Sequence, residues 1–283
     1  MAAESTRPGR EARVKNEEEI AAIRRASEIL SGALTMLREH VVPGVTTVEL
    51  DRLAEEYIRD NGAEPAFKGY APRFAPGGVE AYPWTLCTSR NEEVVHGLPN
   101  DRPLVEGDLI SLDAGVRWNG WNSDSAVTYG VGAIAPERAR LLQVTEEALA
   151  LGVEQAVAGN RVFDIARAVQ RHVQAAGFAV VRELTGHGIG RTIHEDPDIP
   201  NFVPSPFQRH QFRNMLLSAG MTICIEPMVC AGNYRVVTAE DGWTVRTADH
   251  SPAAHFEHTV VVRDEAPEVL TRWPSSIPAP AAP

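Results

Sequence analysis

Apolar residues recur every three or four positions near the beginning of the chain, which is the spacing of one face of a helix. The first series runs from Ile20 to Leu37, behind Asn16 as a capping residue. After a turn, a second series follows the capping residue Thr46 and ends at Gly62. The pattern therefore predicts two consecutive amphipathic helices.

The second of these helical patterns returns 115 residues later in the chain. Seven positions correspond in order: Gly44, Glu49, Leu50, Leu53, Tyr57, Ile58 and Gly62 match Gly159, Asp164, Ile165, Ala168, His172, Val173 and Gly177. A long amphipathic helix precedes each copy, and the later one is expected from about Pro136 to Ala158. A period of this length indicates two related halves rather than a solenoid.

Two alternating segments support the same interpretation. Residues 107–113 read GDLISLD and residues 220–226 read GMTICIE, so each has a glycine, an alternating stretch and a carboxylate six positions on. Each segment is followed by another strand that carries a carboxylate near its start. We therefore expect four carboxylates to converge where the two halves meet: Asp113, Asp124, Glu226 and Glu257.

Four ionised carboxylates in one buried place repel one another unless cations lie between them. Oxygen donors together with one imidazole suit Mn, Fe, Co or Zn. The alternative is that these acids are scattered over the surface, which their matched positions in the two halves disfavour. The pattern therefore predicts a metal site that needs a histidine to complete it.

Three histidines are candidates for a role in such a site. His187 is framed by glycines in the stretch GHGIG, which lets the backbone turn sharply or approach a ligand closely. An ordinary turn that contains a histidine is the alternative. His194 follows seven residues later, and His96 stands where a short apolar strand ends.

Residues 255–258 also contain two histidines, but they form no HExxH zinc motif and indicate a strand instead. We expect alternation along this strand to place both His255 and His258 off the face of Glu257 or at its edge.

Composition adds limits on the cellular setting. The sequence has 283 residues with 27 Lys and Arg against 38 Asp and Glu, a formal net charge of −11, which disfavours a protein that coats nucleic acid or an anionic membrane. No apolar run reaches the length of a membrane span or follows the charged N-terminus as a secretory signal. Three cysteines are too few and too odd in number for a disulfide framework, so we expect a cytoplasmic protein.

Seven motifs in order resemble those of the type I methionine aminopeptidases. They are NEEVVHGLP from Asn91, SLDAG from Ser111, DSA from Asp124, TGHGIG from Thr185, HE from His194, IEPMV from Ile225 and FEHT from Phe256. The resemblance covers roughly residues 16–272 and implies an α/β (α+β) pita-bread fold, with two pseudo-twofold-related halves around a dinuclear metal site. Residues 1–15 and the Pro- and Ala-rich residues 273–283 are then expected to be disordered tails.

The resemblance also implies the metal ligands. They are Asp113, Asp124, His187, Glu226 and Glu257. Asp124 and Glu257 occupy the bridging positions, Asp113 serves one ion, and His187 with Glu226 serves the other. The implied cofactors are two divalent ions, and Co, Mn, Fe and Zn all suit these donors.

The implied activity is removal of the N-terminal methionine from nascent proteins and peptides with a small second residue. The attacking group is a hydroxide that bridges the two ions, and one ion holds the free α-amino group. Glu226 is expected to act as general acid and base. By resemblance, His96 hydrogen-bonds the substrate, and His194 contacts the scissile carbonyl.

The resemblance further implies which side chains line the methionine pocket: Tyr70, Tyr82, Cys87 and Trp243. Two features depart from the family pattern and affect the shape of this pocket. Ile193 stands where the family usually has phenylalanine, and the loop from Tyr70 to Tyr82 is longer than usual.

Three related proteins are alternatives. Proline-specific peptidases of the same fold usually carry an N-terminal domain, for which there is no room before residue 16. Type II methionine aminopeptidases insert a helical block between the last histidine and glutamate motifs, but only 32 residues separate His194 from Glu226. An inactive relative that binds proteins or RNA would have lost metal ligands, and here all five positions are filled.

Partners follow from the same resemblance. Nascent-chain N-termini are the expected substrates, with a transient ribosome contact for which residues 209–213 (RHQFR) are the one basic cluster worth testing. We expect a monomer that forms no stable complex with nucleic acid or membranes.

Overall fold

The computed structural model describes residues 12–71, 80–205 and 212–275. The helices there are α1 (Glu17–Arg38), α2 (Thr47–Asp60), α3 (Pro136–Glu154) and α4 (Val162–Ala175). All four predicted helices are thus confirmed, although α3 ends four residues before the predicted limit. The capping box at the start of α1 is also present, because the Asn16 side chain accepts a hydrogen bond from the Glu19 amide at 2.9 Å.

Antiparallel pairing connects the strands into four sheets. The strands are β1 (Glu64–Pro65), β2 (Leu86–Arg90), β3 (Glu93–Val95), β4 (Leu109–Trp118), β5 (Trp121–Gly130), β6 (Ala179–Val180), β7 (Thr185–Gly188), β8 (Glu195–Pro200), β9 (Thr222–Ile225), β10 (Met228–Cys230), β11 (Val236–Thr238), β12 (Val245–Thr247), β13 (Ala253–His255), β14 (His258–Val261) and β15 (Glu268–Val269). β4 has β5 on one edge and both β1 and β2 on the other. The largest sheet has five strands in the order β15-β14-β9-β7-β8. The two remaining sheets have three strands each, in the orders β13-β10-β6 and β11-β12-β3.

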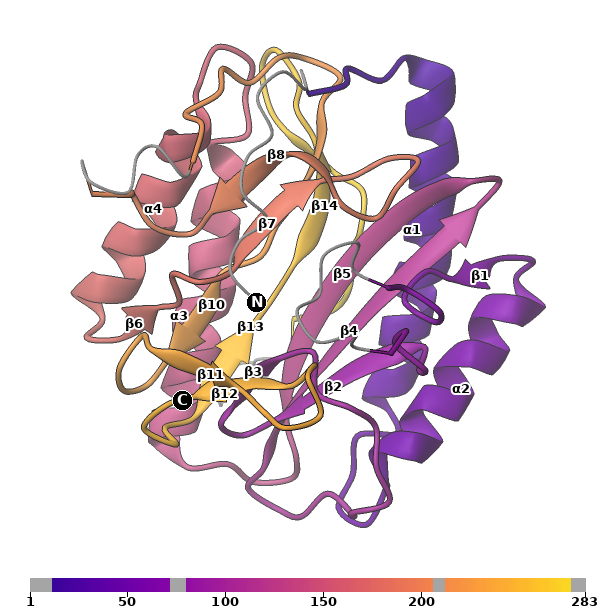
Figure 1. The fold of residues 1–283 in the computed structure, drawn as a ribbon, viewed down its shortest axis with the longest axis vertical. Coiled ribbons are helices and arrows are strands. Elements are labelled where there is room, and N and C mark those ends of the chain that lie inside the picture. The colour runs from indigo at the N-terminus through magenta and orange to yellow at the C-terminus, as the bar shows by residue number, and fades with distance from the viewer. Residues whose placement is uncertain (1–11, 72–79, 206–211, 276–283) are drawn as a thin grey trace, which may run out of the picture.

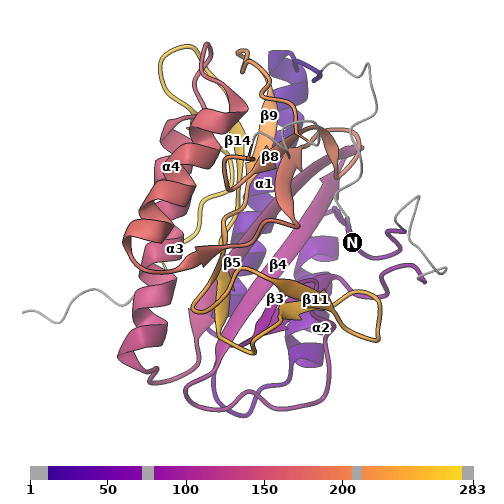
Figure 2. The same ribbon diagram turned by 60° about the vertical axis from the view of Figure 1, so that its left-hand side comes forward.

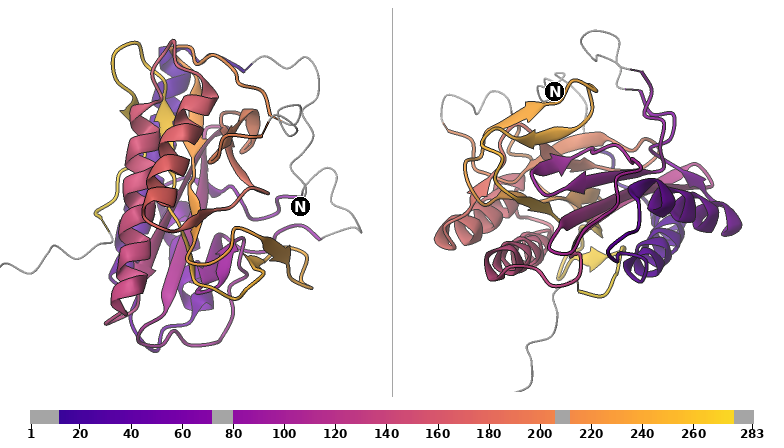
Figure 3. Two further views of the ribbon diagram at one scale, coloured as in Figure 1. Left: turned by 90° about the vertical axis from the view of Figure 1, so that its left-hand side faces the viewer. Right: turned by 90° about the horizontal axis from the view of Figure 1, so that it is seen from below.

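The helices divide between two halves of the molecule. α1 packs on β4 and β5, with α2 beside it, whereas α3 and α4 pack on strands of the second half (Figure 1). All four helices lie on one side of the sheets (Figure 3). The small sheet of β3, β11 and β12 lies on the opposite side (Figure 2). The strands between these layers are buried, and the core of the molecule lies there.

Matched glycines confirm that the two halves are built alike. Three pairs have nearly equal left-handed φ values: Gly44 and Gly159 at 96° and 93°, Gly62 and Gly177 at 71° and 87°, and Gly107 and Gly220 at 90° and 87°. The first two pairs precede and follow α2 and α4, and the third precedes β4 and β9. Residues with a Cβ rarely adopt this conformation, so the repeat in the sequence records a repeat in backbone geometry.

The ordered chain extends beyond the predicted domain limits at both ends. Val14 pairs with Met221, and the buried Lys15 donates its amide to the Gly220 carbonyl at 2.8 Å. At the other end, the Trp273 ring stacks on His258 with centroids 4.6 Å apart. The prediction of disordered tails is therefore wrong for these flanking residues, because long-range pairing and stacking fix them.

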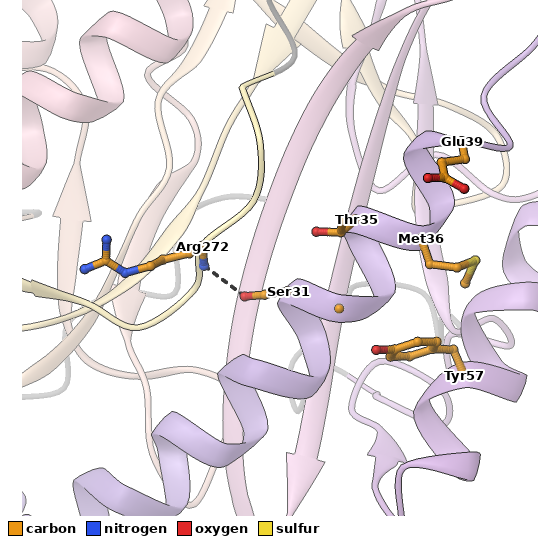
Figure 4. A pocket seen from close by; sticks show the side chains of 7 residues that line it. Ser31, Thr35, Met36, Glu39, Tyr57 and Arg272 are labelled. Atoms are coloured by element: carbon orange, nitrogen blue, oxygen red, sulfur yellow. Dashed lines mark hydrogen bonds between the residues drawn. The ribbon is translucent and has the colours of Figure 1, made fainter.

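One shallow depression lies on the outer surface of the helices (Figure 4). It measures about 510 Å³ and is lined by Ser31, Gly32, Thr35, Met36, Glu39, Tyr57 and Arg272. Tyr57 fits closely over Gly32, where an added Cβ would lie 2.2 Å from its hydroxyl. None of the predicted site residues lines it. Within the described part of the chain, no helix has the length and apolar character of a membrane span.

Candidate metal centre

Strand pairing within the first half and a bridge to the second half bring Asp113 and Glu257 to opposite sides of Ala126. Asp113 lies opposite Ala126 in the register of β4 and β5. On the other side, the Glu257 amide donates to the Ala126 carbonyl at 2.9 Å. Asp124 is two residues from Ala126 and therefore shares its face of β5. Asp113, Asp124 and Glu257 are therefore placed around Ala126 by strand register.

Strand pairing in the second half aligns His187, Cys224 and Thr259. Cys224 on β9 lies opposite His187 on one neighbouring strand and opposite Thr259 on the other. Glu226 directly follows β9, two residues from Cys224, and the Asn201 side chain holds its carbonyl with a 2.6 Å hydrogen bond. Residues far apart in sequence are thus fixed in one register.

The five predicted ligands lie in two adjacent groups of potential donor atoms. Within each group these atoms lie within 4.8 Å of one another: Asp124, His187, Cys224 and Glu257 form the first, and Asp113, Glu226 and His255 form the second. His187 Nε2 lies 3.7 Å from Asp124 Oδ2 and 3.8 Å from Glu257 Oε1. Both groups include a residue that the sequence analysis did not select, and Glu226 lies in the group of Asp113 rather than in that of His187, with which the resemblance paired it.

Burial opposes negative charge on the four carboxyl groups. It raises the pKa of Asp113 to about 8. Burial first, and then the charges of Asp113 and Glu226, raise the pKa of Asp124 well above its usual range. Burial and neighbouring carboxylates likewise raise the pKa values of Glu226 and Glu257. Without compensating cations, the group therefore favours its protonated forms.

Several polar atoms of the group are also unsatisfied. One carboxylate oxygen each of Asp113, Asp124 and Glu257 is buried without a hydrogen-bond partner. Buried polar atoms normally have partners, and exceptions require an explanation. Clustered carboxylate oxygens with an imidazole are donors that suit divalent metal ions, so the residues present fit such ions.

The imidazole of His187 is prepared for the same role. Its Nδ1 lies 3.0 Å from the Gly188 carbonyl, which can only accept a hydrogen bond, so Nδ1 carries the proton. Burial lowers the pKa of His187 to about 4, so the ring is neutral near pH 7. Nε2 therefore presents its lone pair to the carboxylates, as a metal-ligating histidine requires.

The glycines around His187 act differently from the prediction of a sharp turn. His187 lies within strand β7, and both flanking glycines are close to neighbouring backbone. A Cβ on Gly186 would lie 2.2 Å from the Cys224 carbonyl oxygen, and one on Gly188 would lie 2.2 Å from that of Asp196. The glycines thus allow neighbouring strands to approach the histidine closely.

Cys224 and His255 were missed for different reasons. Cys224 shares an alternating segment with Glu226, so its position was available from the sequence, but a single thiol was not expected among oxygen ligands. His255 was expected to lie off the face of Glu257 or at its edge, and it lies in the second donor group, with Asp113 and Glu226. His255 and Glu257 are two positions apart, so simple alternation would place them on the same face, but the strand is interrupted between β13 and β14. His258 does lie outside both groups, where its Nδ1 is 3.0 Å from Thr271 Oγ1.

The two other predicted histidines flank the centre. His194 packs edge-on against His187 with ring centroids 4.4 Å apart, and its Nδ1 lies 3.0 Å from the Tyr70 hydroxyl. His194 is exposed at the surface. Desolvation of its ring by the surrounding protein is nevertheless the larger cause, and the nearby His187 the smaller cause, that lowers its pKa well below the usual range. His96 follows β3 with φ at 59°, a strained value for a residue with a Cβ.

The predicted pocket residues also lie together. Tyr82, Cys87 and Trp243 form one buried apolar cluster, with Phe67 and Tyr70 partly buried against it. The Tyr82 and Trp243 rings meet edge to face, with centroids 5.0 Å apart. Sequence reasoning missed Phe67, because nothing in its local pattern distinguishes it from an ordinary core residue.

Comparison with known proteins now adds to this geometry. Residues 21–264 match the model of metallopeptidase family M24. The chain belongs to this family.

Individual relatives place it among the methionine aminopeptidases of that family. It is 47% identical over 258 residues to a methionine aminopeptidase of Clostridium perfringens, covering 91% of this chain and 98% of the relative. The crystal structure of methionine aminopeptidase from Thermotoga maritima matches with a TM-score of 0.85 and 39% identity, covering 93% of this chain and all of the other. The predicted pita-bread fold is therefore confirmed.

A proline-specific member of family M24 shares the fold alone. Prolidase from Pyrococcus furiosus matches with a TM-score of 0.72 at 24% identity, and this chain covers 65% of its length. That lower coverage agrees with the larger size expected of such peptidases.

The sequence departs from the family pattern at Ile193 and in the long loop from Tyr70 to Tyr82, and the structure describes the surroundings of Ile193. Ile193 is buried with Ile189 and Cys224, and Phe67 and Tyr70 pack against this cluster as well as against the pocket cluster. Phe67 thus places an aromatic ring against the cluster that contains Ile193. Residues 72–79 of the long loop and residues 209–211 of the basic cluster lie outside the described residues, whereas Phe212 is buried against Phe202.

Proposed function

We propose that this M24 peptidase removes the N-terminal methionine from peptides and nascent proteins whose second residue is small. The observation that carries the proposal is the buried carboxylate group with three unsatisfied oxygens and a neutral imidazole aimed at it. The high identity to methionine aminopeptidases over nearly their whole length supports the choice of substrate.

We propose that five residues hold two divalent ions, with Co, Mn, Fe and Zn as candidates. The residues that would hold them are Asp113, Asp124, His187, Glu226 and Glu257, which lie in the two groups of potential donor atoms. When bound, such ions lower the pKa of a coordinated water from ~15.7 towards about 7 and polarise a carbonyl group. Their positive charge also keeps the four carboxyl groups ionised, against the effect of burial.

Glu226 moves the proton during the reaction. Its carboxylate takes a proton from the attacking water and returns it to the leaving amine. Burial, followed by the charge of the neighbouring Asp113, raises the pKa of Glu226, which favours proton uptake. Asn201 fixes the backbone at this position, so the carboxylate stays within the centre.

His194 and His96 bind the reacting part of the substrate. A donor on His194 stabilises negative charge that develops on the scissile carbonyl oxygen. The Tyr70 hydroxyl engages Nδ1 of His194 and leaves Nε2 available for this contact. Burial lowers the pKa of His96 to about 4, so this residue meets the substrate as a neutral ring.

The methionine side chain enters the cluster of Tyr82, Cys87 and Trp243, bordered by Tyr70 and Phe67. An uncharged thioether needs no ionic partner and packs favourably against aromatic edges. The protein is proposed to act as a monomer that meets nascent chains transiently at the ribosome.

Metal-stripped protein assayed on Met-Ala-Ser, after each metal is added back separately, tests the proposal. We expect methionine release to return with at least one of the four metals, and an Ala-Pro peptide to stay intact. The variant Glu257→Ala is expected to lose metal loading and activity together, whereas His96→Ala keeps its metal and turns over more slowly. Full activity of Glu257→Ala would contradict the ligand assignment, and cleavage of Ala-Pro in place of Met-Ala-Ser would contradict the substrate.

A further inference from the structure

The His255 side chain is buried beside the metal centre and has no assigned role. It is 0% exposed, and neither ring nitrogen has a hydrogen-bond partner. Its backbone is fixed by Thr128, whose hydroxyl donates to the His255 carbonyl at 2.6 Å and accepts from its amide at 3.1 Å. The ring is therefore held in place without any polar contact that accounts for its burial.

A buried imidazole with two unsatisfied nitrogens is costly, because the water it gave up is not replaced. The Val94 carbonyl lies near the ring without reaching hydrogen-bond geometry. As an acceptor, this carbonyl favours a proton on the nitrogen that faces it and leaves the lone pair of the other nitrogen free. One nitrogen of His255 thus has a lone pair that no hydrogen-bond donor faces.

Asp113 and Glu226 are the acidic groups near this ring. One donor atom from each of the three residues lies within 4.8 Å of the others, yet the ring makes no hydrogen bond to either carboxylate. Ligands bound to one ion at about 2.0–2.2 Å each lie roughly 3–4 Å apart, which is within the 4.8 Å limit of this group, and the absence of direct hydrogen bonds to the ring favours a shared ion.

We propose that His255 supplies a sixth protein donor to the metal centre, on the ion that Asp113 holds. This inference rests on the proposed metal-dependent function. A nitrogen donor raises affinity for Co²⁺ and Zn²⁺ more than for Mn²⁺, which prefers oxygen. His255 therefore sets the metal preference of that ion as well as its affinity.

His258 offers a control, since it is a half-buried histidine three residues away that stacks on Trp273 outside both donor groups. Metal-free wild type, His255→Gln and His258→Gln are titrated calorimetrically with CoCl₂ and separately with MnCl₂. The visible absorption of the Co²⁺ forms is recorded in parallel, because it reports the ligands directly.

We expect His255→Gln to weaken binding of the second Co²⁺ at least about tenfold, while Mn²⁺ affinity changes by less than about threefold. Its Co²⁺ spectrum should differ from the wild type, and that of His258→Gln should not. Equal loss of Co²⁺ and Mn²⁺ affinity, or an unchanged spectrum in His255→Gln, would overturn the inference. Cleavage of Met-Ala-Ser by the wild type distinguishes failure of this inference from failure of the proposed function. If the wild type cleaves the peptide while His255→Gln gives either contrary result, only the role of His255 fails. If the wild type binds no metal and cleaves nothing, the proposed function fails as well.

Discussion

The Thr259 side chain is hydrogen-bonded to both backbone groups of Asp124, across the boundary between the two halves. Its hydroxyl donates to the Asp124 carbonyl at 2.8 Å and accepts from the Asp124 amide at 3.1 Å. The opposite side of Thr259 is paired with Cys224. A single hydroxyl thus joins β5, which carries Asp124, to β14, which begins directly after Glu257.

Replacing Thr259 with valine removes this connection and leaves the Asp124 amide buried without a partner. We expect Thr259→Val to destabilise the protein by about 1–3 kcal/mol and to weaken metal binding. Chemical denaturation and calorimetric metal titration measure the two effects. Thr88→Val is the matched control, because Thr88 is equally buried but its hydroxyl has no hydrogen-bond partner. Equal losses in both variants would argue against the connection.

Lys15 links the N-terminal segment to the loop that carries His194. Its ammonium group lies 2.9 Å from Glu195 Oε2 and is almost completely buried. Removing one partner of such a pair leaves the other without compensation. We expect Lys15→Met to lower stability by about 1–3 kcal/mol and to reduce kcat on Met-Ala-Ser with metal content unchanged.

The effect of Lys15→Met on kcat should exceed that of Arg25→Met, since Arg25 pairs with Glu28 on the exposed surface of α1. Equal kcat values for the two variants would show that the N-terminal segment does not position His194.

The metal-free protein should lose thermal stability as the pH rises from 6.5 to 9. Burial raises the pKa of Asp113 to about 8 in the folded state, above its value in the unfolded chain. The folded state therefore binds more protons, and this contribution to stability disappears as the pH rises through 8. Addition of Mn²⁺ should reverse the trend, because the ions bind the deprotonated carboxylates.

Thermal melts in EDTA and in excess Mn²⁺ measure this pH effect. Asp113→Asn is expected to flatten the metal-free profile. A melting temperature in EDTA that rises between pH 6.5 and 9 would contradict the explanation.

Phe67 should determine how tightly the methionine side chain is held. It packs against both the pocket cluster and the Ile193 cluster. We expect Phe67→Ala to lower kcat/KM for Met-Ala-Ser about tenfold or more, mainly through KM, and Ile193→Phe to restore part of the loss in the double variant. Phe178→Ala is the control, because Phe178 packs against the main core instead. A KM unchanged by Phe67→Ala would exclude this role.

Local patterns in the sequence predicted the four helices and the carboxylates on matched strands. Helix periodicity and caps depend on residues within a few positions of one another, as Asn16 and Glu19 show at the start of α1. The paired glycines that flank α2 and α4 likewise record a local need for left-handed backbone. The seven motifs then identified the family, and with it five expected ligand positions.

The sequence by itself thus determined the helices, the repeat and the acidic donors, because each depends on short-range geometry. Only the tertiary structure decided which side chains share the centre with them. His255 and Cys224 join the donor groups, Phe67 borders the pocket, and Lys15 supports the His194 loop. These contacts depend on register and burial between segments that are distant in the chain, and no local spacing encodes the partner across a sheet.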